Sequence, residues 1–312
     1  MDVRIFDPST FTIPHGDGQR FGPLAADGKG IMRTSVDPEN FTTGLKTENG
    51  RFKQFVDIVD NGQPCPYRAE FTDWDWMLNK PIGTYELITY EQMITTPINN
   101  QSPVSIFQSY VKDKKEPDNN GSVIWQLELS GYKQMTGAEV GQLQIINHVA
   151  KNADGKYLRK VTPFIPQQNV PFLVTFEALH ESKENGGFLK ITINEDVLHE
   201  SNENMIFEHF QVCGQPKFGI YHHYLRTNYE EWAAKNIAAG HNKFYMETGP
   251  VTIIRFDPGE ARPTYHYSLA KPVRPSLAAK PPEENNDGSY DEGFIAGVKQ
   301  EVDALNQYAA SR

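Results

Sequence analysis

Polar and apolar residues alternate in a series of short segments between Arg51 and Phe256. The alternation is clear in RFKQFVDIV, TYELITYEQMI, VSIFQSYV, SVIWQLELSG, GQLQIINHV, FLVTFEAL, GFLKITINEDVL, KFGIYHHY and VTIIRF. These segments are rich in β-branched and aromatic residues, and Gly, Pro, Asn and Asp separate them, as in strands joined by turns. Because the strands follow one another with almost no helical pattern between them, we expect an all-β, antiparallel sandwich or jelly roll.

The pattern divides the chain into four parts. Residues 1–50 read as an N-terminal arm of loops with one or two short strands, and residues 51–257 as the β domain. Residues 258–288 are rich in proline and predict an extended linker, and residues 289–312 predict a short C-terminal helix. Inside the β domain, NYEEWAAKNIAAGHN, residues 228–242, predicts one short helix between the last two strands.

Composition and charge exclude several classes of protein. Lys and Arg total 30 against 40 Asp and Glu, a net charge of −10, which argues against a nucleic-acid partner. No apolar run approaches the roughly 18 residues that span a bilayer. The N-terminus lacks a secretory pattern, so we expect a protein that works where it is made, has lost its leader, or leaves the cell in a larger particle. Whether Cys65 and Cys213 pair stays open.

The segment QPKFGIYHHYLRTN concentrates polar groups that could do chemistry. In an extended strand alternate side chains share a face, so Lys217, Gly219, Tyr221 and His223 should project together. Gly219 would leave a gap through which a polymer could approach the backbone. The alternative is a core strand with a polar outer face.

Two other strands carry candidate groups at the same spacing of two. Arg68 and Glu70 share a face in PYRAEFTDWDW, where a carboxylate can hold a guanidinium that offers a planar fork to a substrate carboxylate. Ile106, Gln108 and Tyr110 share a face in VSIFQSYV. The alternatives are a surface ion pair for the first strand and a satisfied hydrogen-bonded pair for the second.

These three segments, in this order, resemble the jelly-roll polysaccharide lyases of concanavalin A-like fold, which cleave alginate, heparin and glucuronan. The matching stretches are Arg68-Ala69-Glu70, Gln108-Ser109-Tyr110 and Lys217-Phe218-Gly219-Ile220-Tyr221, and the resemblance covers roughly residues 50–257. The chain departs from the family at Tyr110, where the family has a histidine. His148, His222 and His223 are the candidates to replace that histidine, and Gln126 and Gln144 are rivals of Gln108.

The resemblance implies β-elimination on a polysaccharide that contains uronic acid. In that reaction Arg68 and Gln108 would neutralise the substrate carboxylate, and Tyr221, helped by His223, would serve as acid alone or as both acid and base. The side chains implied in substrate binding are Lys217, Glu70, Tyr110 and Trp125, and Trp74 and Trp76 could also stack on sugar rings. No cofactor is implied, and a structural Ca²⁺ in a loop stays open.

Two other readings come from different classes of protein. The first is a non-catalytic carbohydrate-binding protein that kept the sandwich and lost the histidine. The second is a structural component of a virion, such as a decoration or tail protein, because the arm and the C-terminal segment could join the chain to copies of itself or to a larger particle. Under all three readings an extracellular or virion-associated location is favoured over the cytoplasm.

Overall fold

The computed structural model describes residues 2–10, 20–21, 31–34, 43–58, 68–72, 80–98, 102–111, 122–131, 137–151, 155–207, 212–223, 225 and 228–260. In chain order the elements are β1 (Asp2–Phe6), η1 (Pro8–Thr10), β2 (Arg20–Phe21), β3 (Ile31–Thr34), β4 (Thr43–Glu48), β5 (Arg51–Asp57), β6 (Arg68–Thr72), β7 (Tyr85–Ile94), β8 (Val104–Val111), β9 (Ser122–Leu129), β10 (Leu143–Lys151), β11 (Tyr157–Val161), β12 (Phe172–Leu179), β13 (Phe188–Ile193), β14 (Asp196–Asn202), β15 (Gln215–Tyr221), α3 (Tyr229–Ala238) and β16 (Lys243–Phe256).

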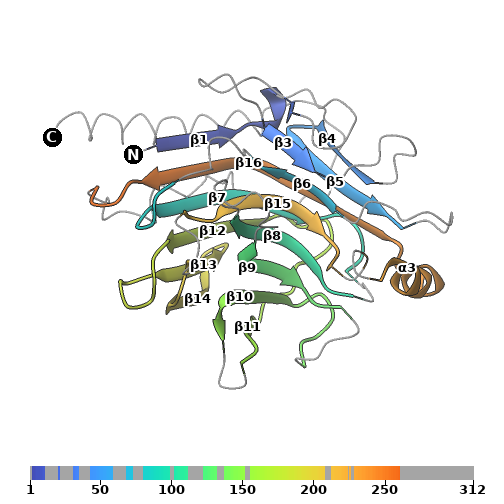
Figure 1. Ribbon diagram of the computed structural model, residues 1–312. Helices are drawn as coiled ribbons and strands as arrows, with labels where there is room; N and C mark the ends of the chain where they lie inside the picture. The colour runs from blue at the N-terminus through green and yellow to red at the C-terminus, as the bar shows by residue number, and fades with distance from the viewer. Residues whose placement is uncertain are drawn as a thin grey trace.

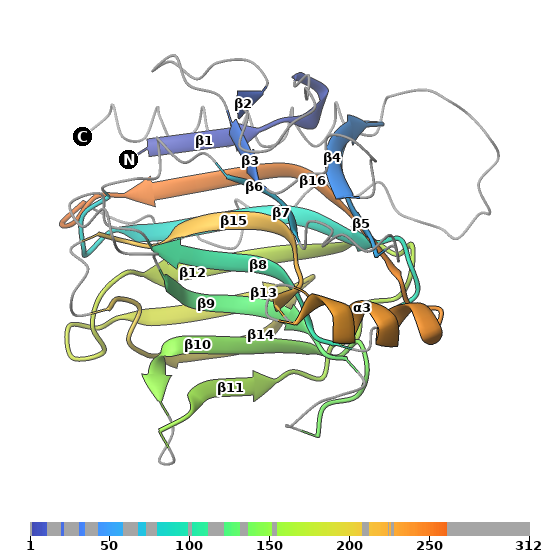
Figure 2. The same ribbon diagram turned by 45° about the vertical axis from the view of Figure 1, so that its right-hand side comes forward.

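The strands form two antiparallel sheets that pack face to face as a β-jelly roll, as the alternating pattern predicts (Figures 1 and 2). Sheet A has the strand order β14-β13-β12-β7-β16-β5-β4, and β1 also pairs with β16. Sheet B has the order β11-β10-β9-β8-β15-β6-β3-β2. Neighbours such as β7 and β16, or β8 and β15, lie more than a hundred residues apart in the chain, so the centre of each sheet depends on long-range pairing.

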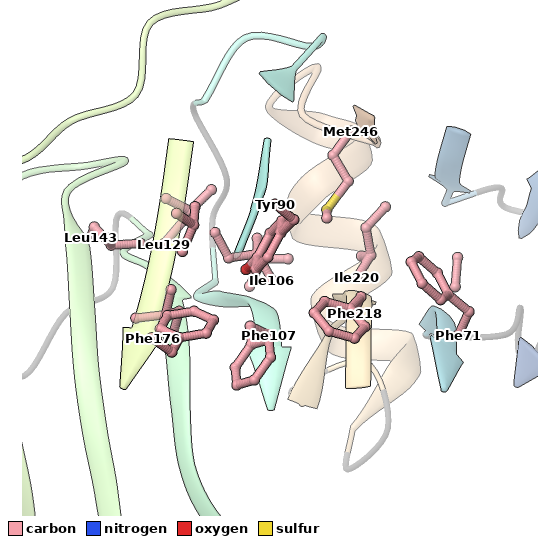
Figure 3. Close-up of a cluster of buried hydrophobic side chains, with 14 of the residues drawn as sticks. Phe71, Tyr90, Ile106, Phe107, Leu129, Leu143, Phe176, Phe218, Ile220 and Met246 are labelled. Carbon is pink, nitrogen blue, oxygen red and sulfur yellow. The ribbon is translucent and has the colours of Figure 1, made fainter. Parts of the chain in front are cut away.

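The hydrophobic core fills the space between the two sheets (Figure 3). Its centre is a cluster of aromatic rings: the ring centroids of Phe107 and Phe176 lie 4.5 Å apart, and Tyr90 makes an edge-on contact with Phe218 at 5.2 Å. Pairs of this kind add to the stabilisation that burial alone provides. Because Phe107 and Phe218 come from sheet B and Tyr90 and Phe176 from sheet A, the cluster joins the two layers.

The N-terminal residues contribute more strands than the sequence pattern indicates. β1 pairs with the second half of β16, and β4 forms a hairpin with β5. The hairpin turns at Asn49 and Gly50, which both have positive φ, as a two-residue turn of this kind requires. The short helix expected over residues 228–242 is present as α3, which lies at the end of the sandwich where β16 begins (Figures 1 and 2). The expected linker beyond residue 260 and the expected C-terminal helix lie outside the described residues.

We expect Phe176→Ala to lower the free energy of unfolding by about 3–5 kcal/mol, because it empties the centre of the aromatic cluster. Urea unfolding followed by tryptophan fluorescence measures the change. Val197→Ala is the matched control: Val197 is 48% exposed on β14, so its truncation should change the stability by less than about 0.5 kcal/mol. Equal losses in the two variants would contradict the core assignment.

Candidate active site

The outer face of sheet B, turned away from the core, carries a continuous band of polar side chains. The strands that supply it lie in succession from β6 through β15, β8, β9 and β10 to β11 (Figure 2). We call this band the polar face; it consists of Arg68, Glu70, Gln108, Tyr110, Gln126, Glu128, Gln144, Arg159, Lys217 and Tyr221. The register aligns it: Arg68 lies opposite Tyr221, Lys217 opposite Gln108, Gln108 opposite Gln126, and Gln144 opposite Glu128.

Arg68 and Tyr221 form the first contact on the polar face. The guanidinium carbon of Arg68 lies 4.8 Å from the centre of the Tyr221 ring, and its Nη1 lies 3.7 Å from Oε2 of Glu70. Arg68 and Glu70 therefore share one face of β6, as their spacing of two residues predicts. A guanidinium held by a carboxylate on one side and a phenol ring on the other has a fixed position, which favours recognition of an anion.

Lys217 and Tyr110 form a second cation–tyrosine pair. The Lys217 ammonium lies 3.8 Å from the centre of the Tyr110 ring. Lys217 is 5% exposed and Tyr221 is 8% exposed, so both pairs are largely removed from water. An aromatic ring stabilises a desolvated cation without cancelling its charge. Tyr110 of β8 thus holds the lysine of the neighbouring strand β15.

Three glutamines and a glutamate form a hydrogen-bonded row next to these pairs. Gln108 Nε2 donates to Gln126 Oε1 at 3.1 Å, and Gln126 Nε2 donates to Glu128 Oε2 at 3.1 Å. Arg159 Nη1 donates to Glu128 Oε1 at 3.2 Å and to Gln144 Oε1 at 2.9 Å. The two rivals of Gln108 therefore lie on the same face, and all three amides belong to one network.

Burial raises the pKa of Glu128 to about 7, against the opposing effects of Arg159 and Gln126. The polar face thus contains a carboxyl group that changes its charge near neutral pH. Glu128 and Arg159 were not among the residues that the sequence indicated. The alternation in WQLEL could have identified Glu128, which lies two residues after Gln126. The KYLRKV segment, which forms β11 and carries Arg159, has no alternation of apolar residues and so did not indicate a strand.

The three candidate histidines occupy different places. His223 follows the end of β15 and is exposed, with its ring 6.3 Å from that of Tyr221. His148 packs against Tyr157 at 4.6 Å, and burial, with the charges of Arg159 and His223, lowers its pKa to about 4. His222 is buried on the core side against Phe244, where burial lowers its pKa to about 4. Only His223 is in ring contact with Tyr221.

Two expectations about individual side chains are corrected. Trp125 lies in the core against Phe107 and Phe176, so it cannot stack on a sugar at the polar face. Ile106 is also in the core, because a β-bulge between Ser105 and Phe107 turns it away from Gln108. Trp74 and Trp76 lie outside the described residues.

Gly219 does not leave a gap for a polymer. A Cβ atom at Gly219 would lie 2.2 Å from the Ala69 carbonyl oxygen and 2.7 Å from the Glu70 Cα, and its φ is +137°. The backbone of β6 therefore fills the space beside Gly219. Glycine is required here because it lets β6 and β15 approach closely, and this approach brings Arg68 to Tyr221.

No metal or redox centre is indicated in the described part of the chain. Within those residues no group of three or more His, Cys, Asp or Glu side chains could hold a metal ion. Cys213 is buried, and burial raises the pKa of its thiol to about 12. Cys65 lies outside the described residues, so the question of its pairing is untested. Among the described helices, none has the length and apolar character needed to cross a membrane.

No protein-family model and no curated protein matches the chain. Solved structures that match include an endo-β-1,4-glucuronan lyase from the fungus Trichoderma reesei, at 12% identity over 74% of this chain and 91% of that chain, with a TM-score of 0.49. Alginate lyase A1-II′, a member of polysaccharide lyase family 7, matches at 9% identity over 68% and 83%, with a TM-score of 0.45. Alginate lyase AlyC3 matches at 11% identity over 82% and 89%, with a TM-score of 0.46. The expected resemblance to jelly-roll polysaccharide lyases is thus found among solved structures, and at these identities it concerns the fold.

We expect Gly219→Ala to destabilise the protein by about 2–5 kcal/mol, through the clash with the β6 backbone and the strain of a side chain at positive φ. Gly249→Ala is the matched control, because a Cβ atom at Gly249 in β16 meets nothing closer than 3.4 Å. Urea unfolding of both variants measures the difference. A Gly219→Ala variant as stable as Gly249→Ala would contradict the close approach of β6 and β15.

We expect Glu128→Gln to change how stability depends on pH. In the wild type the raised pKa means that the folded state holds the Glu128 proton more tightly than the unfolded state does, so the stability falls as pH rises from about 4.5 to about 7. The variant lacks this loss. Its stability relative to wild type should therefore rise by on the order of 2 kcal/mol between about pH 5 and about pH 8, measured by urea unfolding. A difference that is independent of pH would contradict the raised pKa.

Proposed function

We propose that the protein cleaves a polysaccharide containing uronic acid by β-elimination at the polar face. The observation that supports the proposal is that Arg68 and Tyr221, in ring contact, lie on the same face of sheet B as Lys217 and Gln108, which are paired four residues away along β15. These residues come from three strands that are distant in sequence. Together they supply two cations, an amide and a phenol on one face of one sheet.

The reaction makes three demands on these groups. A base removes the proton at C5 of the uronate, and the electron pair left behind forms the C4=C5 double bond as the C4–O4 bond breaks. The departing O4 then takes a proton from an acid. While the proton leaves, negative charge grows on the uronate carboxylate, so fixed positive charges and N–H donors beside it lower the barrier.

The polar face offers a group for each role. Arg68 and Gln108 neutralise the uronate carboxylate, and Lys217 adds a positive charge in the row of Gln108. Tyr221 gives the proton to O4 and takes the C5 proton, or shares that work with His223, the exposed histidine beside it. Glu70 contributes by holding the Arg68 guanidinium.

A second candidate is a carbohydrate-binding protein that lacks turnover. It is favoured by Tyr110, which replaces the family's histidine with a ring that holds Lys217. Such a protein would use the same cations to bind an anionic polymer. Binding and turnover must therefore be measured separately.

We expect the wild-type protein to raise the ultraviolet absorbance of a uronate polymer as the unsaturated sugar forms. The polymer panel includes glucuronan and alginate, the substrates named for the similar solved structures. Tyr221→Phe keeps the ring under Arg68 but removes the proton-carrying hydroxyl, so turnover should fall by roughly a hundredfold to ten-thousandfold with polymer binding retained.

Tyr245→Phe is the matched control, because Tyr245 lies on β16 of sheet A and is no part of the polar face. Its turnover should equal that of the wild type. Normal turnover in Tyr221→Phe would remove Tyr221 from the reaction. Binding of a uronate polymer by the wild type without any turnover across the panel would replace the lyase with the second candidate.

A further inference from the structure

We propose that Glu128 and Arg159 are positioning residues, which act through Gln126 to fix the amide of Gln108 in the orientation that a uronate carboxylate needs. This inference rests on the proposed function and extends the site beyond the residues that contact substrate. We call Arg159, Glu128, Gln126 and Gln108 the relay. Its members come from β11, β9 and β8, so it crosses the sheet from its edge toward Lys217 of β15, which lies opposite Gln108.

The direction of the relay follows from its carboxylate end. An ionised carboxylate can only accept hydrogen bonds, so Gln126 must present its NH₂ group to Glu128. Its carbonyl oxygen then faces Gln108, which must in turn present its own NH₂ group to Gln126. The amide of Gln108 is thereby fixed in one of its two orientations, and one N–H of Gln108 is left for a substrate.

The direction of these hydrogen bonds matters because the groups that make them are buried. Gln108, Gln126 and Glu128 are all buried, and Gln144 shares Arg159 with Glu128. Hydrogen bonds in such surroundings are stronger than in water, and an amide turned the wrong way leaves buried groups without partners. Arg159 anchors the outer end, since its Nη1 donates to both Glu128 and Gln144.

The relay should respond to pH. In the strand register Glu128 lies opposite Ser105 of β8 and Gln144 of β10, and Gln126 lies two residues away on its own strand. Among the described residues, the charged group that acts on Glu128 is Arg159 of β11. Protonation of Glu128 removes one acceptor and lets the amide of Gln126 turn. The order of the Gln108 amide should then be lost as pH falls below about 7.

The decisive test uses Glu128→Gln, which keeps the shape of the side chain but lets either end of the new amide face Gln126. We expect kcat on the uronate polymer to fall by roughly tenfold to a hundredfold with a smaller change in KM. A misplaced Gln108 amide loses more of its interaction with the transition state than with the bound substrate. The wild-type loss of kcat below about pH 7 should be absent in the variant. Arg159→Lys, which keeps the charge, should retain more activity than Arg159→Met.

Glu177→Gln is the matched control. Glu177 is a buried glutamate of sheet A that accepts a hydrogen bond from the Tyr85 hydroxyl at 2.7 Å, and it is no part of the polar face. Its kcat and pH profile should match those of the wild type. Loss of kcat in Glu177→Gln equal to that in Glu128→Gln would mean that the effect reports general stability, which would overturn the positioning role.

A measurement that needs no turnover separates the relay from the proposed function. In protein labelled with ¹⁵N at glutamine, the side-chain amide resonances of Gln108 and Gln126 should shift together with a midpoint near pH 7 in the wild type and lose that transition in Glu128→Gln. Resonances without a common transition would overturn the relay even in an active enzyme. A common transition in a wild type that cleaves no uronate polymer would support the relay and overturn the proposed function.

Discussion

The register of β15 between β6 and β8 ties the core to the polar face. On one side of β15, Phe218 lies opposite Phe71 and Phe107 and joins the aromatic cluster. On the other side, Lys217 and Tyr221 meet the side chains of the polar face. Because the side-chain period of a strand is two, a slip of one residue would exchange Phe218 with Lys217 and place a charge in the core. The hydrophobic core therefore fixes the positions of the groups that the proposed reaction requires.

The sequence could predict which side chains share a face where a strand has no bulge, because that depends only on the alternation within one strand. Arg68 with Glu70, and Lys217 with Tyr221, follow from this rule and from it alone. Which strands become neighbours depends on long-range pairing, which no local pattern encodes. The resemblance to lyases indicated that the strands of the three motifs are neighbours in the sheet. It gave no information about residues outside those motifs, such as Glu128 and Arg159.

The incorrect expectations have local physical causes. Ile106 follows the alternation rule in the sequence, but one extra residue in β8 forms a bulge and reverses its direction. Trp125 has the size and chemistry of a sugar platform, yet its parity in β9 places it with the core residues beside Phe107. β11 could not be recognised because four of its five residues are exposed, which leaves no apolar alternation. Gly219 suggested open space, whereas the backbone of β6 occupies it.

On the polar face Arg68 lies against the Tyr221 ring, and Lys217, four residues before Tyr221 on β15, lies against the Tyr110 ring. Arg68 also has the Glu70 carboxylate at 3.7 Å, which offsets part of the charge that it presents to an anionic polymer. A ring stabilises the cation and leaves its charge in place. Tyr110 therefore provides a support for Lys217, and in the proposed reaction the proton transfers are assigned to Tyr221 and His223.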